Sequence, residues 1–83
     1  MPMPESEIYS KLTLLFHDIF DDESIVLNSS MTPDDVEGWD SFKHAALIVQ
    51  AEKEFGIKFQ PAEMEASRNI GVLVRQIAAK LPA

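Results

Sequence analysis

Apolar residues near the start of the chain recur at the period of an amphipathic helix, and they are Ile8, Leu12, Leu15, Phe16 and Ile19. Glu5 and Glu7 precede them, where the positive end of a helix dipole favours negative charge. The pattern stops at the acidic run that begins at Asp21. We therefore predict a first helix over residues 5–20.

The next stretch, residues 21–40, has no sustained period and is rich in Asp, Ser, Asn, Thr, Pro and Gly. At about 20 residues it is longer than an ordinary connection between helices, and long loops of this kind are more often functional. We expect its scattered apolar residues to hold it against the core, and these are Val26, Leu27, Met31 and Val36. The sequence thus predicts a long, ordered loop.

A second helix is predicted over residues 41–55, between an N-cap at Asp40 and a C-terminal stop at Gly56. Pro61 suits the first position of a helix, so a short third helix is expected over residues 61–66.

The last helix is expected over residues 70–81, with Asn69 as its N-cap. Gly71 lies inside it at a cost of about 1 kcal/mol relative to Ala. Because no segment requires a strand, we predict an all-α four-helix bundle with a long loop between the first two helices and a short third helix. A chain of 83 residues is expected to form one domain over residues 1–83.

The second helix carries two apolar stripes. At about 100° per residue, one stripe is the expected core face and comprises Leu47, Ile48, Ala51 and Phe55. The second stripe is displaced from the first and comprises Phe42, Ala45, Ala46 and Val49. It is either buried by the long loop or exposed as a docking surface, and the sequence leaves both alternatives open.

Composition narrows the possible functions. Seven basic and 14 acidic residues give a net charge of −7, which repels phosphate backbones and suits docking onto basic patches of larger partners. No apolar run approaches the roughly 20 residues of a membrane span, and the acidic, proline-containing start does not resemble a secretory signal. The chain contains no cysteine. We expect a monomeric cytoplasmic protein that binds neither nucleic acid nor membranes.

Two segments carry a specific pattern. Residues 35–42 read Asp-Val-Glu-Gly-Trp-Asp-Ser-Phe, and residues 52–57 read Glu-Lys-Glu-Phe-Gly-Ile. A Gly-x-Asp-Ser-Leu-like step that opens a helix, followed by a Glu-x-x-Phe-Gly-Ile end, resembles the acyl carrier protein family. The resemblance covers nearly the whole chain, including its length, helix order and long first loop.

The resemblance implies that Ser41 carries 4′-phosphopantetheine through a phosphodiester and that Asp40 marks the helix start. Acyl or aminoacyl cargo would travel as a thioester on this arm, and the protein would be a carrier rather than an enzyme. The implied partners are a phosphopantetheinyl transferase that uses coenzyme A, a cargo-loading ligase or acyltransferase, and a downstream synthase or transferase.

The alternative for Ser41 is a plain capping serine in a small acidic helical adaptor without a prosthetic group. The glutamate or glutamine of a capping box is absent, however, since Lys43 and His44 stand at the corresponding positions. A helix N-terminus also favours a nearby phosphate.

The family's partners dock chiefly along the second helix, so the resemblance assigns partner contact to Phe42, Lys43, His44, Ala46, Val49 and Met64. Trp39 either anchors the loop or faces a partner. Fatty-acid carriers usually have Leu after the serine and acidic residues along the exposed side of this helix, whereas this chain has Phe42, Lys43, His44 and Ala46. Its negative charge lies instead before the serine and, on the third helix, at Glu63 and Glu65. The sequence around Ser41 therefore looks more like carriers dedicated to polyketide, peptide or other specialised pathways.

Two rival sites are not favoured. A Ser41–His44 nucleophilic pair has no evident orienting acid or oxyanion hole. The acidic cluster does not have the spacing of a calcium-binding loop, so no metal site is predicted; it comprises Asp34, Asp35, Glu37 and Asp40. His17 is expected to be an ordinary surface residue.

Overall fold

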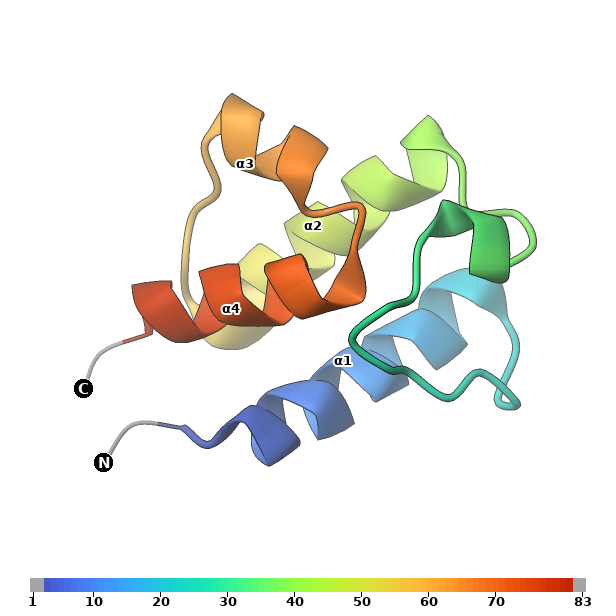
Figure 1. The fold of residues 1–83 in the computed structure, drawn as a ribbon, viewed down its shortest axis with the longest axis horizontal. Coiled ribbons are helices and arrows are strands. Elements are labelled where there is room, and N and C mark those ends of the chain that lie inside the picture. Colours follow the sequence, from blue (N-terminus) through green and yellow to red (C-terminus); the bar gives the residue numbers. More distant parts are fainter. Residues whose placement is uncertain (1–2, 82–83) are drawn as a thin grey trace.

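The computed structural model describes residues 3–81, and every regular element in that range is helical. The elements are α1 (Glu5–Phe20), the 3₁₀ helix η1 (Pro33–Asp35), α2 (Ser41–Phe55), α3 (Pro61–Ala66) and α4 (Ile70–Lys80) (Figure 1). The predicted four-helix fold is confirmed, with the last helix ending one residue earlier than expected. The long loop leaves the end of α1 and returns to the start of α2, with η1 inside it (Figure 1).

Local capping sets the helix ends. The Asp40 carboxylate accepts a hydrogen bond from the backbone N–H of Lys43 over 2.8 Å, so Asp40 is the N-cap of α2 as predicted. Gly56 ends the same helix in the left-handed conformation, with φ of 67°, which a glycine adopts without steric penalty. Asn69 caps α4 by accepting from the N–H of Val72 over 3.0 Å.

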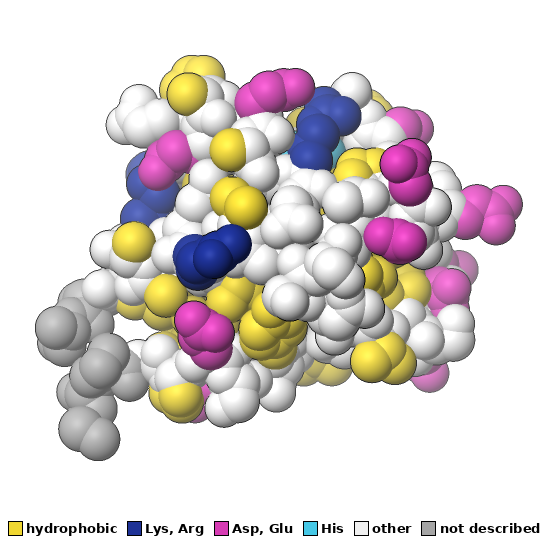
Figure 2. All heavy atoms as spheres, in the orientation of Figure 1, with side chains coloured by type: hydrophobic (Ala, Val, Ile, Leu, Met, Phe, Trp, Pro, Cys, Tyr) yellow, Lys and Arg dark blue, Asp and Glu magenta, His cyan; other side chains and the backbone are white. Residues whose placement is uncertain are grey.

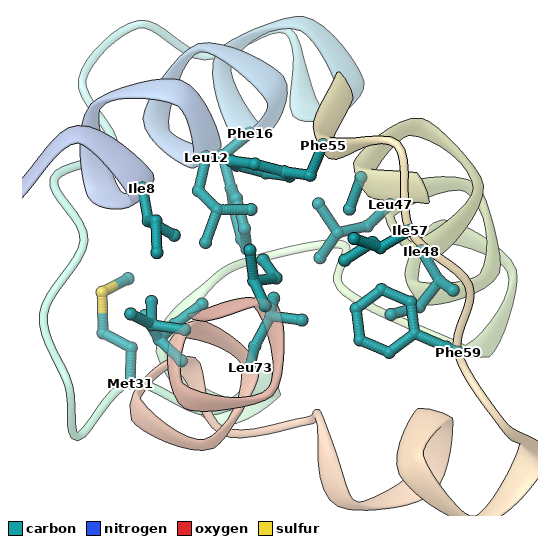
Figure 3. Packing of buried hydrophobic residues seen from close by; sticks show 14 of the residues in the cluster. Ile8, Leu12, Phe16, Met31, Leu47, Ile48, Phe55, Ile57, Phe59 and Leu73 are labelled. Atoms are coloured by element: carbon teal, nitrogen blue, oxygen red, sulfur yellow. The ribbon is translucent and has the colours of Figure 1, made fainter. Parts of the chain in front are cut away.

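The core lies between α1, α2 and α4 and is completed by the segment between α2 and α3 (Figure 3). α1 contributes Ile8, Leu12 and Phe16, and the predicted core stripe of α2 is buried in full. α3 has no fully buried residue, but Met64 packs against the core. α3 is also tied to its neighbours through its backbone, since the Glu63 carbonyl accepts from Gln76 Nε2 over 3.2 Å and the Met64 carbonyl oxygen lies 2.9 Å from His44 Nε2.

Most of the long loop is anchored as expected. Met31 and Val36 are buried and Leu27 packs against the core, but Val26 is 79% exposed, so the prediction was wrong there. The reason is that the backbone also holds this loop: the Ser29 carbonyl accepts from the N–H of Gly71 over 3.0 Å. The loop is therefore held in place without Val26 as a further apolar anchor.

His17 also differs from the prediction. It is half-buried, and its Nε2 lies 2.8 Å from the Ile25 carbonyl oxygen, so it ties the end of α1 to the loop. The longest helix has 16 residues, and none within residues 3–81 is both long and apolar enough to cross a membrane.

Candidate functional site

Ser41 is the first residue of α2, and it is exposed. The start of α2 lies where the long loop ends (Figure 1). The first N–H groups of a helix have no acceptor within the helix. The Asp40 side chain accepts from Lys43 N, which leaves the amides of Ser41 and Phe42 free of that cap. The hydroxyl thus sits at the positive end of a 15-residue helix, where an anion is favoured.

The Arg68 side chain contacts the Ser41 hydroxyl. Its Nη2 donates a hydrogen bond to Ser41 Oγ over 3.2 Å, although the two residues are 27 positions apart. Arg68 lies in the turn between α3 and α4. Sequence reasoning missed it, and the one available signal was weak: Arg68 is the sole basic residue between Lys58 and Arg75.

Trp39 and His44 form a buried pair beneath the site. They are 5% and 4% exposed, and the Trp39 indole N–H donates to His44 Nδ1 over 3.1 Å. His44 was expected to contact partners, and Trp39 either to anchor the loop or to face a partner, but little of either side chain reaches the surface. Trp39 anchors the loop instead, with its ring edge-on to that of Phe16 at a centroid distance of 5.3 Å.

The other ring nitrogen of His44 joins α2 to the segment that carries Arg68. His44 Nε2 lies 2.9 Å from both the Met64 carbonyl oxygen and Ser67 Oγ. Burial is the main cause that lowers the pKa of His44, and the charge of Arg68 acts in the same direction. Because both ring nitrogens are engaged in these contacts, His44 is not available to activate Ser41 as a base.

The second apolar stripe of α2 is exposed rather than covered by the loop. Phe42 is 79% and Val49 46% exposed, Ala45 is exposed, and Ala46 is half-buried. We refer to these four residues as the α2 apolar surface. Of the two alternatives left open by the sequence, the structure thus excludes burial.

Lys43 and Met64, also expected to contact partners, are both half-buried. The Lys43 ammonium group donates to the Ile19 carbonyl oxygen over 3.0 Å, so it interacts with the last turn of α1. Met64 lies on α3 and packs against the core.

Acidic side chains gather on the side of the molecule where the long loop meets α2 (Figure 2). They include the exposed residues Asp34, Asp35, Glu37 and Asp40. Within residues 3–81 no three His, Asp or Glu side chains are grouped so that they could hold a metal ion. The site therefore combines the exposed Ser41 hydroxyl, the neighbouring Arg68 guanidinium, the α2 apolar surface and a group of acidic side chains beside them.

Comparisons with known proteins agree with this geometry, although no protein-family model matches the chain. It is 34% identical over 76 residues to the acyl carrier protein of Thermotoga maritima, covering 90% of this chain and 93% of that protein. The solution structure of holo acyl carrier protein from Geobacter metallireducens superposes with a TM-score of 0.81 at 38% identity, covering 87% of this chain and 83% of that one. The chain therefore belongs to the acyl carrier protein family, whose members are carriers rather than enzymes.

Proposed function

We propose that Ser41 carries 4′-phosphopantetheine and that the protein shuttles thioester-bound acyl or aminoacyl intermediates between biosynthetic enzymes. The observation that carries this proposal is the exposed Ser41 hydroxyl at the first position of α2, in contact with the Arg68 guanidinium. The likeness to a holo acyl carrier protein supports it. When bound, the group supplies a flexible arm ending in a thiol that holds the cargo as a thioester.

The residues present fit such a group. A phosphodiester on Ser41 Oγ would lie at the N-terminal end of the α2 dipole and beside a cation. Asp40 keeps the helix start at this position by capping Lys43 N. Among residues 3–81 no side chain is placed to remove the Ser41 proton, so the transferase that delivers the group from coenzyme A must also supply the base.

We further propose that the partners recognise the α2 apolar surface next to Ser41, rather than an acidic surface. The first turn of α2 contains no acidic residue, and Phe42 projects into solvent directly after the attachment serine. The negative charge lies before Ser41, where a basic patch on a partner would meet it. This distribution supports a carrier for a specialised pathway, such as polyketide or peptide synthesis. We also propose that the protein acts as a monomer in the cytoplasm.

The decisive experiment is an intact-mass measurement after incubation with coenzyme A and a promiscuous phosphopantetheinyl transferase. We expect one added phosphopantetheinyl group on the wild type, none on Ser41→Ala, and one on Ser30→Ala, which changes an exposed serine in the loop before α2. An unmodified wild type with several transferases would contradict the proposal and favour an adaptor without a prosthetic group.

A further inference from the structure

We propose that Arg68 is the residue that binds the phosphodiester of the prosthetic group and so orients the arm as it leaves Ser41. The inference rests on the proposed function, since it requires a phosphate on Ser41. It adds a binding residue from the α3–α4 turn to a site otherwise built from the loop and α2.

The first observation concerns the hydrogen-bond partner of the Arg68 guanidinium. In a chain of net charge −7, a guanidinium would ordinarily pair with a carboxylate. The ion pairs among residues 3–81 are Lys11–Glu54 and Lys80–Glu63, and Arg68 takes part in neither. Its hydrogen bond is instead to the neutral Ser41 Oγ, at 3.2 Å. The cation is thus placed at the one oxygen to which the phosphate would be attached.

The second observation concerns the rest of the guanidinium. Arg68 Nε is buried and has no hydrogen-bond partner, so one donor of the guanidinium is unused. A guanidinium presents several N–H donors in a rigid plane that matches the oxygens of a phosphate. In a phosphodiester on Ser41 the phosphorus is bonded to Oγ, and two non-bridging oxygens are one bond further. Arg68 Nη2, 3.2 Å from Oγ, is therefore the guanidinium nitrogen next to which these acceptors would appear.

The backbone on both sides of Arg68 is held in place. Ser67 is fully buried, and its hydroxyl lies 2.7 Å from the Met64 carbonyl oxygen and 2.9 Å from His44 Nε2. Asn69 caps α4 through the N–H of Val72. A residue between two anchored neighbours starts from a restricted backbone, which reduces the entropy that must be lost when its side chain binds a ligand.

The charges near Ser41 indicate what a cation would contribute to binding a phosphate there. The Asp40 carboxylate is adjacent to Ser41 and would repel a phosphate. Lys43, the basic residue closest in sequence, has its ammonium group on the Ile19 carbonyl oxygen. Arg68 is accordingly the cation positioned to offset the added negative charge.

The test compares Arg68→Gln and Arg68→Lys with Arg75→Gln, a matched control that removes the same charge from an exposed position on α4. Each protein is converted to the holo form, and conversion is verified by intact mass. The readouts are the ³¹P chemical shift of the phosphodiester, the shift of the Arg68 Nε–H cross-peak between apo and holo wild type, and the change in Tm on conversion.

We expect the Arg68 cross-peak to move on conversion of the wild type. Arg68→Gln should shift the ³¹P resonance and lower Tm of the holo form relative to the apo form, whereas Arg75→Gln should behave as the wild type and Arg68→Lys should lie between.

The inference is wrong if Ser41 is fully modified but the cross-peak stays in place and the ³¹P shifts of the Arg68 and Arg75 variants coincide. That result would show that Arg68 does not bind the phosphate. Failure of the wild type to accept the group contradicts the proposed function instead, so the two failures are distinguishable. If Arg68→Gln does not fold, the movement of the wild-type cross-peak and the ³¹P shift of Arg68→Lys still show whether Arg68 binds the phosphate.

Discussion

The indole N–H of Trp39 donates a hydrogen bond to Nδ1 of His44 over 3.1 Å in the interior of the protein. Because Nδ1 is the acceptor, the neutral ring carries its proton on Nε2, which lies 2.9 Å from the Met64 carbonyl oxygen. One side chain thus joins the loop, α2 and α3. Since Ser41 precedes His44 by less than one helical turn, this pair supports the part of α2 that carries the site.

The His44 environment predicts a pH dependence of stability. Burial lowers the pKa of His44 below its ordinary value of 6.5, the nearby Arg68 charge adds to this, and the Met64 carbonyl and the Glu65 charge oppose it. The unfolded chain therefore binds a proton that the folded protein does not. The free energy of unfolding should be at its full value above the unfolded pKa and fall as pH decreases from there toward the folded pKa.

Urea unfolding between about pH 7.5 and 5.5 measures this effect while most carboxylates remain ionised. His44→Gln should flatten the decline. Equal slopes in the wild type and His44→Gln would contradict the prediction. An NMR titration of the His44 ring in the wild type checks the direction of the pKa shift without a variant.

Trp39→Phe should destabilise the fold. It removes the indole donor and leaves His44 Nδ1 buried without its partner, which costs about 2 kcal/mol. Chemical denaturation followed by circular dichroism measures the loss, with Phe42→Ala as a control that should change stability by less than about 0.5 kcal/mol because Phe42 is exposed. A loss below that control value for Trp39→Phe would show that the hydrogen bond contributes little.

Phe42→Ala should instead impair partner recognition. Phe42 is 79% exposed next to Ser41, and aromatic residues at the centre of an interface commonly contribute about 2 kcal/mol, or roughly 30-fold in affinity. The measurement is kcat/KM for loading by the cognate enzyme. Leu14→Ala, at a 67% exposed position on α1, is the matched control. Similar kcat/KM values for the two variants would place the docking surface elsewhere.

Asp40→Ala should lower the free energy of unfolding by about 1 kcal/mol, because it removes the carboxylate that caps Lys43 N. Asp40→Asn should retain most of the stability, since an amide oxygen can accept the same bond. Thermal unfolding of both variants tests this prediction. Equal destabilisation by Ala and Asn would mean that the negative charge, rather than the cap, stabilises the helix start.

Gly71→Ala should destabilise the protein, although alanine is the better helix former. A Cβ at Gly71 would lie 2.7 Å from the Ser29 backbone oxygen, and this clash should outweigh a propensity gain of about 1 kcal/mol, for a net loss of about 1–2 kcal/mol. Ala78→Gly, at an exposed position in α4, calibrates the propensity effect. An increase in Tm for Gly71→Ala would show that the loop yields easily.

The helix bounds were predictable because local chemistry sets them. Asp40, Gly56, Pro61 and Asn69 each act on backbone groups within a few residues, and the structure places all of them at the predicted helix ends. The core face of α2 followed from its period for the same reason. The identification of Ser41 as the candidate attachment residue likewise depended on a short contiguous pattern.

Tertiary structure alone decided what surrounds Ser41. The Arg68 guanidinium reaches it across 27 residues, and His44 is buried by contacts with Met64 and Ser67 that are 20 and 23 positions away. No local period encodes such contacts, because they depend on how α3 and the turn after it pack beside α2. Gly71 shows the same contrast between sequence and structure. The sequence reveals a residue that is unfavourable inside a helix, and only the structure shows that the Ser29 backbone lies too close for a side chain at this position.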